Sequence, residues 1–249
     1  MQKYIAIIPA RLQSTRLPRK PLADLSGKTM LERVFLAVNS AKLLSNVIIA
    51  TDSYEIAKLC KEINANFVIT DPELPSGTDR IYQAYKHFNE KADVIINIQG
   101  DEPFITAQLI DDFILFLENQ KFDVGTIIKR ISNNEEIENP SVVKVVINPL
   151  NYALYFSRSA IPFLRDIPKE QWLSNAVFYK HIGIYAYQEQ SLSQFVNLGI
   201  SYLEKNEKLE QLRLLENGSK YLCFETTQDL FSIDTYEDLE KARKLFARQ

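Results

Sequence analysis

Residues 4–21 read YIAIIPARLQSTRLPRKP and contain both the first expected element of the fold and the first candidate site. The run from Tyr4 to Ile8 is short, apolar and not alternating, which is typical of a strand buried on both faces of a parallel sheet. The loop over 9–21 then carries four cations, two hydroxyl side chains and three prolines. Cations at this position suit a polyanion such as a triphosphate, and prolines lower the entropic cost of ordering the loop. A solvated basic loop is the alternative.

The same strand pattern recurs at 46–50, 66–70 and 93–98, with helical segments between these runs. Alternating strands and helices predict an α/β fold: a doubly wound, mostly parallel, Rossmann-like sheet with right-handed crossovers. Ligands of such sheets bind beyond the carboxyl ends of the strands. We therefore expect the site among residues 9–21, 51–53, 71–80 and 99–103.

The segment from about 141 to 187 interrupts this alternation. Strand-like runs at 142–147, 152–156 and 181–187 follow one another without long helices. This pattern predicts an inserted antiparallel extension, and its exposed edge is a candidate surface for a homodimer. Helices are expected again over 201–217 and 235–247. Because no repeat or linker is visible, we expect one domain over 1–249.

Composition excludes several classes of protein. The chain has 249 residues, a formal net charge of −3, 46% hydrophobic and 24% charged residues. Weak acidity argues against a general nucleic-acid binder, and no apolar run approaches the roughly 20 residues of a membrane span. Cys60 and Cys223 form no metal or redox motif, which favours a reducing, cytoplasmic location.

Glycine is scarce, with seven in the chain and no G-x-G. The dinucleotide fingerprint and the Walker signature are therefore both absent. We expect a phosphate site in this chain to depend on side chains more than on bare backbone.

Two motifs follow later strands. In Gln99-Gly100-Asp101-Glu102-Pro103, glycine permits a sharp turn and the acidic pair suits a hard divalent cation such as Mg²⁺. In Ser76-Gly77-Thr78-Asp79-Arg80, a small-residue turn opens a helix and could accept a base or an anion. Helix capping is the alternative for both motifs.

Two further positions stand apart from these loops. Asp234 lies before the last expected helix, where capping is the simpler interpretation. His181 and Tyr185, four residues apart in an expected strand, share a face and could line a polar pocket, although a satisfied core histidine is more frequent.

The motifs occur in a recognisable order along the chain, from Ile8 to about Leu239: IPAR, STRLP, KPL, ATD, SGTDR, QGDEP, YFSR, HIGIY, EKLEQLR and IDTYEDL. This order resembles the 3-deoxy-manno-octulosonate cytidylyltransferases, also called CMP-Kdo synthetases. QGDEP together with the EQLR helix is specific to that family.

The resemblance implies an enzyme for lipopolysaccharide biosynthesis in which the anomeric hydroxyl of the sugar acid Kdo attacks the α-phosphorus of CTP, giving CMP-Kdo and pyrophosphate. It implies Arg11, Lys20, Asp101 and Asp234 as catalytic residues. The two aspartates are the implied Mg²⁺ ligands. The implied nucleotide-binding residues are Arg11, Arg16, Lys20, Ser76, Gly77, Arg80 and Gln99. The implied sugar-binding residues are Arg158, His181, Tyr185, Glu210 and Gln211.

Two positions depart from the family pattern. Relatives often have glycine where this chain has Arg19 and Ser232. If glycine serves a positive φ there, Arg or Ser would be strained, and the two loops could differ in shape. Two alternatives to a Kdo enzyme stay open: a cytidylyltransferase for another sugar acid, of amino-Kdo or sialic type, and a nucleotide-binding paralogue without catalysis.

Overall fold

The computed structural model describes residues 2–13 and 17–247. Contacts divide the chain into two compact units. Unit 1 comprises residues 1–118 and 229–249, and unit 2 comprises residues 119–228. The organisation into one domain stays a prediction.

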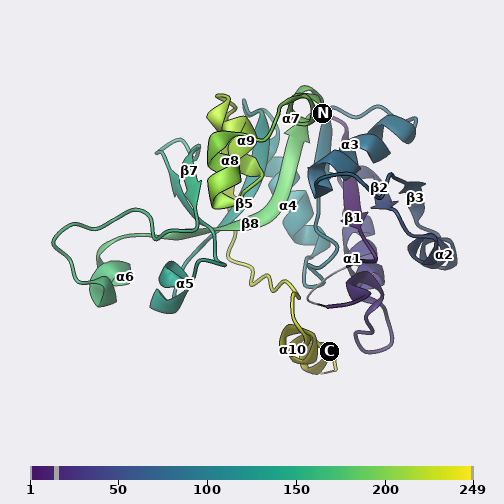
Figure 1. Ribbon diagram of the computed structural model, residues 1–249, viewed down its shortest axis with the longest axis horizontal. Coiled ribbons are helices and arrows are strands. Elements are labelled where there is room, and N and C mark those ends of the chain that lie inside the picture. Colours follow the sequence, from purple (N-terminus) through teal and green to yellow (C-terminus); the bar gives the residue numbers. More distant parts are fainter. Residues whose placement is uncertain (1, 14–16, 248–249) are drawn as a thin grey trace. The chain divides into compact units, whose positions relative to one another are not determined.

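Unit 1 is built on parallel strands in the order β3-β2-β1-β4 (Figure 1). Their bounds are β1 Tyr4–Ala10, β2 Leu44–Thr51, β3 Asn66–Ile69 and β4 Val94–Asn97. All four strands were predicted, and β1 is buried from Tyr4 to Ile8 as its apolar run indicated. The strand order reverses between β1 and β4, and such a reversal opens a crevice at the carboxyl ends of the two strands.

The helices of unit 1 start at the caps that the sequence provides. They are η1 Lys20–Leu22, α1 Met30–Asn39, α2 Tyr54–Glu62, α3 Gly77–His87, α4 Ala107–Leu117 and α10 Tyr236–Phe246. Ser53 and Ser76 accept backbone N–H groups at the starts of α2 and α3. Thr235 and Asp238 form the capping box of α10, which satisfies two amide donors at once. Cys60, on α2, is fully buried.

Unit 2 contains the predicted antiparallel strands together with two that the sequence pattern did not reveal. Its strands are β5 Val124–Arg130, β6 Lys144–Ile147, β7 Ala153–Ser157, β8 Tyr179–Gln188 and β9 Tyr221–Glu225. β5 pairs antiparallel with β8 and parallel with β9, while β6 pairs antiparallel with β7 and β8. The structure is therefore a mixed α/β fold with antiparallel strands beside the parallel ones, as expected.

The helical region predicted over 201–217 is two helices. The helices of unit 2 are α5 Asn134–Glu138, η2 Lys169–Gln171, α6 Trp172–Asn175, α7 Glu189–Asn197, α8 Tyr202–Glu207 and α9 Gln211–Glu216. Lys208 has a φ of 55° and ends α8 in the left-handed region. The expected helical region is therefore divided at Lys208, a charged residue with no helix-breaking signature.

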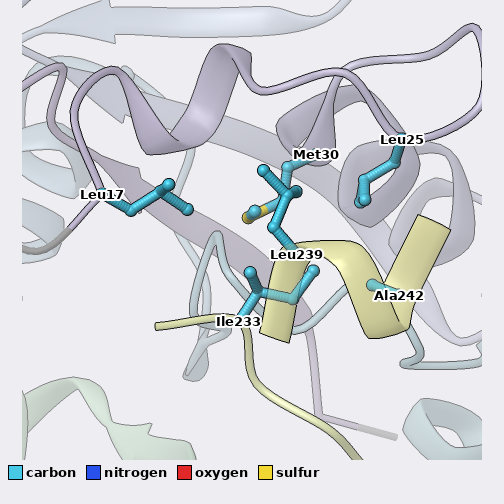
Figure 2. Packing of buried hydrophobic residues seen from close by; sticks show 6 residues of the cluster. All are labelled: Leu17, Leu25, Met30, Ile233, Leu239 and Ala242. Carbon is cyan, nitrogen blue, oxygen red and sulfur yellow. The ribbon is translucent and has the colours of Figure 1, made fainter. Parts of the chain in front are cut away.

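The carboxyl-terminal segment is anchored within unit 1 by a small apolar cluster (Figure 2). Ile233 and Ala242 are fully buried, and Leu239 nearly so. They pack with Leu25 and Met30, which come from the chain before and at the start of α1. This burial fixes the chain on both sides of Asp234.

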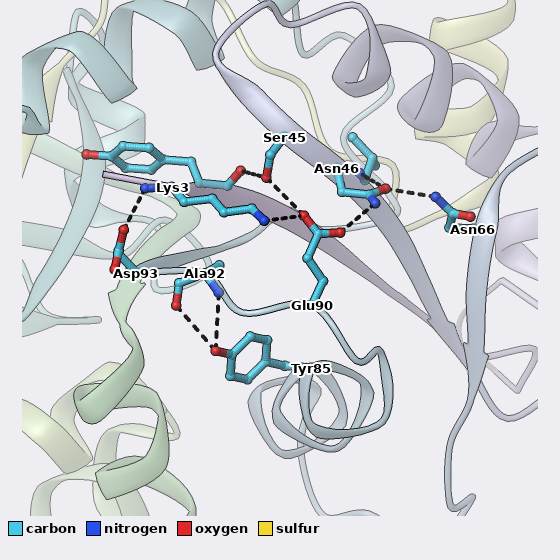
Figure 3. A network of polar contacts seen from close by, with 10 residues as sticks. Lys3, Ser45, Asn46, Asn66, Tyr85, Glu90, Ala92 and Asp93 are labelled. Carbon is cyan, nitrogen blue, oxygen red and sulfur yellow. Dashed lines mark hydrogen bonds and ion pairs between the residues drawn. The ribbon is translucent and has the colours of Figure 1, made fainter. Parts of the chain in front are cut away.

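A polar network joins the amino ends of the strands in unit 1 (Figure 3). Glu90 accepts hydrogen bonds from Lys3 Nζ at 2.9 Å and Asn46 Nδ2 at 2.9 Å. Asp93 accepts from the backbone N–H of Lys3 at 2.7 Å. The hydrogen bond from Lys3 is the main cause that lowers the pKa of Glu90. The network ties β1, β2 and the start of β4 together at the end opposite the carboxyl-terminal loops.

Across residues 2–13 and 17–247, no helix has the length and apolar character needed to cross a membrane.

Candidate active site

Unit 1 has a pocket of about 420 Å³ at the reversal point between β1 and β4. Its lining comes from the loops after these two strands and from the segment before α10: Pro9, Ala10, Arg11, Gln13, Lys20, Pro21, Gln99, Gly100, Asp101 and Asp234. Of the four loops expected from the rule for carboxyl ends of parallel strands, 9–21 and 99–103 line this pocket, whereas 51–53 and 71–80 are not among its lining residues. Five of the candidate residues named from the sequence line this one pocket.

Lys20 is the centre of the charge arrangement in this pocket. Its Nζ lies 2.5 Å from Asp101 Oδ2 and 2.9 Å from Asp234 Oδ1. Burial alone would lower the pKa of Lys20, but the two carboxylates, Asp101 first, outweigh burial and raise it. Residues that are far apart in sequence therefore form a charged triad in which Lys20 is an ammonium.

The two carboxylates fit a divalent cation. Because both contact the same ammonium, they converge on a volume that a single cation can occupy. Within the described part of the chain, no three His, Cys, Asp or Glu side chains gather to hold a metal. A pair of carboxylates is nevertheless what Mg²⁺ commonly uses, since it completes its octahedron with water and substrate phosphates. The donor set therefore suits Mg²⁺ brought in with a nucleotide.

Asp234 is held in place by its neighbours. The N–H of Ile233 donates to the carbonyl of Asp101 at 3.1 Å, which joins the two metal-candidate segments directly. The N–H of Asp234 donates to Asp238 Oδ2 at 3.2 Å. The cap of α10 is Thr235, so the alternative in which Asp234 itself caps the helix is wrong. The Asp234 carboxylate instead contacts Lys20.

Glu102, the second acid of the QGDEP motif, differs in its environment from Asp101. Its side chain is buried, and burial, followed by the charge of Asp101, raises its pKa to about 7. A hydrogen bond with Ser232 opposes this rise. One carboxyl oxygen of Glu102 has no hydrogen-bond partner among the described residues. Adjacent carboxyls of one motif therefore have different properties, with Asp101 facing Lys20 and Glu102 enclosed.

Gly100 lies in the predicted turn and also serves a close approach. The N–H of Glu102 donates to the carbonyl of Gln99 at 3.3 Å, which closes the turn. A Cβ built at Gly100 would lie 3.2 Å from the carbonyl oxygen of Pro9, tighter than nine in ten real contacts of that kind. Gly100 is absent from the positive-φ glycines of the described chain, so packing of the β4 loop on the β1 loop, and not a positive φ, is what favours glycine here.

The two departures from the family pattern have different consequences. Arg19 adopts φ 57° and ψ 30°, the left-handed conformation that glycine tolerates better. Its guanidinium pairs with Glu55 on α2. Ser232 is not among the positive-φ residues of the described chain, so serine is unstrained there. Lys20 thus follows a residue in the left-handed conformation that glycine favours, whereas the serine before Ile233 and Asp234 has no positive φ.

The loop around Ser76 is joined to the β1 loop by Arg11. Arg11 Nη2 donates to the carbonyls of Leu74 at 2.6 Å and Ser76 at 3.0 Å. Arg80 is fully buried, and its guanidinium bonds Thr70 and, at 2.9 Å, Asp52. Arg80 therefore links the loop after β2, through Asp52, to the loop after β3, through Thr70. Arg16 lies outside the described residues.

The candidate sugar residues are all in unit 2. The rings of His181 and Tyr185 are 5.2 Å apart, so the predicted shared face is confirmed. The hydroxyl of Tyr185 donates a hydrogen bond to Gln211 Oε1 at 3.1 Å. Burial is the main cause that raises the pKa of Tyr185, and the charges of Tyr187 and Glu210 add to it. Arg158 is engaged elsewhere, donating Nε at 2.8 Å to the carbonyl of Glu207.

Sequence reasoning missed two residues that support this set. Glu207 accepts hydrogen bonds from the Ser157 hydroxyl at 2.6 Å and the Arg158 N–H at 2.9 Å, and so holds the YFSR segment. Thr126 lies 2.9 Å from the His181 ring nitrogen Nε2. Glu207 stands in the EKLEQLR motif, which was a usable signal, whereas Thr126 lies on a strand with no signature.

Comparison with known proteins shows the family of this chain. Residues 5–248 match the family model described as Cytidylyltransferase. A 3-deoxy-manno-octulosonate cytidylyltransferase from Parabacteroides distasonis is 44% identical over the whole of both chains. One of the same name from Thermodesulfovibrio yellowstonii is 44% identical over 96% of each chain. The solved structure of a CMP:2-keto-3-deoxy-manno-octonic acid synthetase complexed with CTP matches 99% of each chain, with a TM-score of 0.91 and 35% identity. This chain therefore belongs to the 3-deoxy-manno-octulosonate cytidylyltransferase family of nucleotidyltransferases.

Proposed function

We propose that this chain transfers CMP from CTP to the anomeric hydroxyl of Kdo, releasing pyrophosphate, as a step toward lipopolysaccharide. The observation that carries the proposal is the convergence of Asp101 and Asp234 on Lys20 in a pocket at the strand reversal of a cytidylyltransferase chain. Displacement at phosphorus depends mainly on positioning and on charge neutralisation, and this pocket offers groups for both.

The residues of unit 1 would bind and orient the triphosphate. Asp101 and Asp234 would hold Mg²⁺, and Lys20, displaced from them, would turn its ammonium to the phosphate oxygens. Arg11 would keep the Ser76 loop against the β1 loop while contacting the nucleotide, with Gln99, Gly77 and Arg16 nearby in the family pattern. Bound Mg²⁺ would supply charge neutralisation on the phosphates and a lower pKa for the attacking hydroxyl.

The residues of unit 2 would bind the sugar acid. Such a substrate carries several hydroxyls and one carboxylate, and it requires donors, acceptors and a cation. The donors and acceptors would come from His181, Tyr185, Glu210 and Gln211. Arg158 would supply the cation, with its guanidinium turned toward the substrate from the backbone carbonyls of Glu207, Pro140 and Lys208 to which it donates here. In this arrangement the sugar pocket, rather than the triphosphate site, determines which sugar acid is accepted.

The test is pyrophosphate release by the purified chain with CTP and a panel of sugar acids. We expect product with Kdo and Mg²⁺, none without a sugar acid, and none after EDTA treatment until Mg²⁺ is restored. Faster release with an amino-Kdo or a sialic-type acid would favour the other sugar acid as substrate. Tight CTP binding by a folded sample, with no release on any acid, would favour the non-catalytic paralogue.

We further propose that the enzyme works in the cytoplasm as a homodimer. The free cysteines Cys60 and Cys223 are compatible with a reducing compartment. Among the described residues β7 pairs only with β6, and the nearby side chains of Leu150 and Leu154 are 71% and 60% exposed. Sedimentation should give twice the mass of one chain, and Leu154→Lys should shift it toward one chain. A wild-type mass of one chain would contradict the dimer.

A further inference from the structure

A β-bulge in unit 2 places three polar groups together. The pairing of β5 with β8 runs Thr126 to Tyr185 and then Ile127 to Ile182, so residues 183 and 184 of β8 have no partner in the ladder. The hydroxyl of Thr126, which is fully buried, donates to the Ile184 carbonyl at 2.8 Å. The same Oγ1 lies 2.9 Å from Nε2 of His181. Thr126 thus satisfies a carbonyl that the bulge removes from the sheet, and it contacts His181 as well.

The number of protons shared by the Thr126 hydroxyl, the Ile184 carbonyl and His181 determines which ring nitrogen of His181 is protonated. A carbonyl oxygen has no proton, so the contact between Thr126 and Ile184 uses the single hydroxyl proton of Thr126. The remaining contact therefore needs a proton on Nε2 of His181, which donates to Thr126 Oγ1. Burial lowers the pKa of His181 to about 3, so the ring is neutral at physiological pH. A neutral ring that carries its proton on Nε2 has a bare lone pair on Nδ1.

A candidate donor is linked to His181 through Tyr185. Phe156 contacts the His181 ring edge-on with a centroid distance of 5.0 Å, and the centroid of the Tyr185 ring lies 5.2 Å from that of His181. Tyr185 fixes Gln211 through its Oε1. Nε2 of Gln211, a residue only 3% exposed, has no hydrogen-bond partner among the described residues. A buried amide without a partner is costly, and a ligand oxygen would satisfy it.

We propose that Thr126 is a positioning residue that fixes His181 as the Nε2–H tautomer, so that Nδ1 accepts a hydrogen bond from a hydroxyl of the sugar acid. The inference rests on the proposed function, because that function supplies a polyhydroxylated substrate. Thr126 acts through His181 and has no direct role in the chemistry. Gln211, held by Tyr185, would donate to a substrate oxygen beside that hydroxyl.

The tautomer can be measured without substrate. The chain has two histidines, and His87 is exposed at the end of α3, so His87→Gln leaves His181 as the only imidazole. Nitrogen-15 NMR of that variant at neutral pH should show Nε2 as the protonated, pyrrole-type nitrogen and Nδ1 as the pyridine-type one. A signal from protonated Nδ1, or an average of the two tautomers, would overturn the inference.

The positioning role has a kinetic test with a matched pair of variants. Thr126→Val keeps the shape and removes the hydroxyl, whereas Thr126→Ser keeps the hydroxyl. We expect Thr126→Val to raise KM for Kdo about tenfold with KM for CTP unchanged, and to lose the tautomer preference. Thr126→Ser should restore both properties. An equal rise of KM for Kdo and for CTP in Thr126→Val would overturn the positioning role of Thr126. So would a Thr126→Ser variant with the same defects as Thr126→Val. If Thr126→Val does not fold, the KM of Thr126→Ser for Kdo and the nitrogen-15 signal of His181 still test the positioning role.

The two tests separate this inference from the proposed function. Wild-type protein that makes CMP-Kdo but carries the proton on Nδ1 would overturn the tautomer and leave the function standing. Folded wild-type protein with Nε2–H that turns over no sugar acid would overturn the function and, with it, the sugar hydroxyl as the partner of Nδ1.

Discussion

Asp101→Asn should reduce the turnover of CTP and Kdo by about 10²–10³-fold without disturbing the fold. The substitution keeps the size of the side chain and removes one of the two carboxylates that converge on Lys20. An amide oxygen is a poor replacement for a charged ligand of Mg²⁺. The fold should persist because Lys20 retains Asp234 and because the backbone contact from Ile233 to residue 101 is unaffected. Steady-state pyrophosphate release at several Mg²⁺ concentrations measures the loss, and the Mg²⁺ requirement should rise.

A matched control shows whether the loss of turnover comes from removing a carboxylate charge in the pocket or from removing any surface carboxylate charge. Asp112 is exposed on α4 and accepts a hydrogen bond from Gln108 at 2.7 Å, one helical turn away. Asp112→Asn makes the same chemical change away from the pocket, and it should leave turnover and Mg²⁺ dependence as in the wild type. Near-normal turnover of Asp101→Asn would remove Asp101 from the metal site.

The part of this site that follows strands β1 and β4 could be predicted because its signal is local. An apolar run ending in a basic loop indicated the loop that contains Lys20, and one ending in QGDEP indicated the acidic pair that contains Asp101. The family resemblance then singled out these two residues. Their meeting with Asp234 could not be read from spacing, since Lys20 and Asp234 are 214 residues apart. The link depends on the burial of Ile233, an ordinary hydrophobic residue until the fold shows what it packs against. For this position only the family resemblance supplied the function.

Unit 2 was less predictable for a related reason. β5 and β9 have no distinctive flanking signals, and the bulge in β8 that engages Thr126 depends on pairing between strands far apart in sequence. A run of charged residues such as that over 204–213 is typical of a solvated helix surface, yet Glu204 and Arg213 are 7% and 6% exposed. The charges along α8 do not show that α9 covers Glu204. That packing depends on the direction in which the turn at Lys208 sends the chain.

Glu204→Gln should therefore destabilise unit 2 strongly, by about 3–5 kcal/mol. Arg213 donates Nε to Glu204 Oε2 at 2.8 Å and Nη2 to Glu204 Oε1 at 2.7 Å, while its guanidinium carbon lies 4.0 Å from the Phe195 ring centre. Neutralising Glu204 leaves the guanidinium charged and buried without its counterion. Trp172, the single tryptophan, is buried in unit 2, so its fluorescence during urea unfolding reports the loss.

Two comparison variants show whether the cost comes from the unpaired buried charge. Glu237→Gln breaks a pair with Lys241 whose side chains are 79% and 58% exposed, and it should cost less than about 1 kcal/mol. The double variant Glu204→Gln with Arg213→Met removes both buried charges and should recover part of the lost stability, because replacing a whole buried pair with apolar groups is often near neutral. A double variant less stable than Glu204→Gln alone would mean that Arg213 stabilises unit 2 mainly through Phe195 and the Phe195 carbonyl, which it contacts at 3.3 Å. The ion pair between α8 and α9 would then contribute less to stability than the contacts of Arg213 with Phe195, which join α9 to α7.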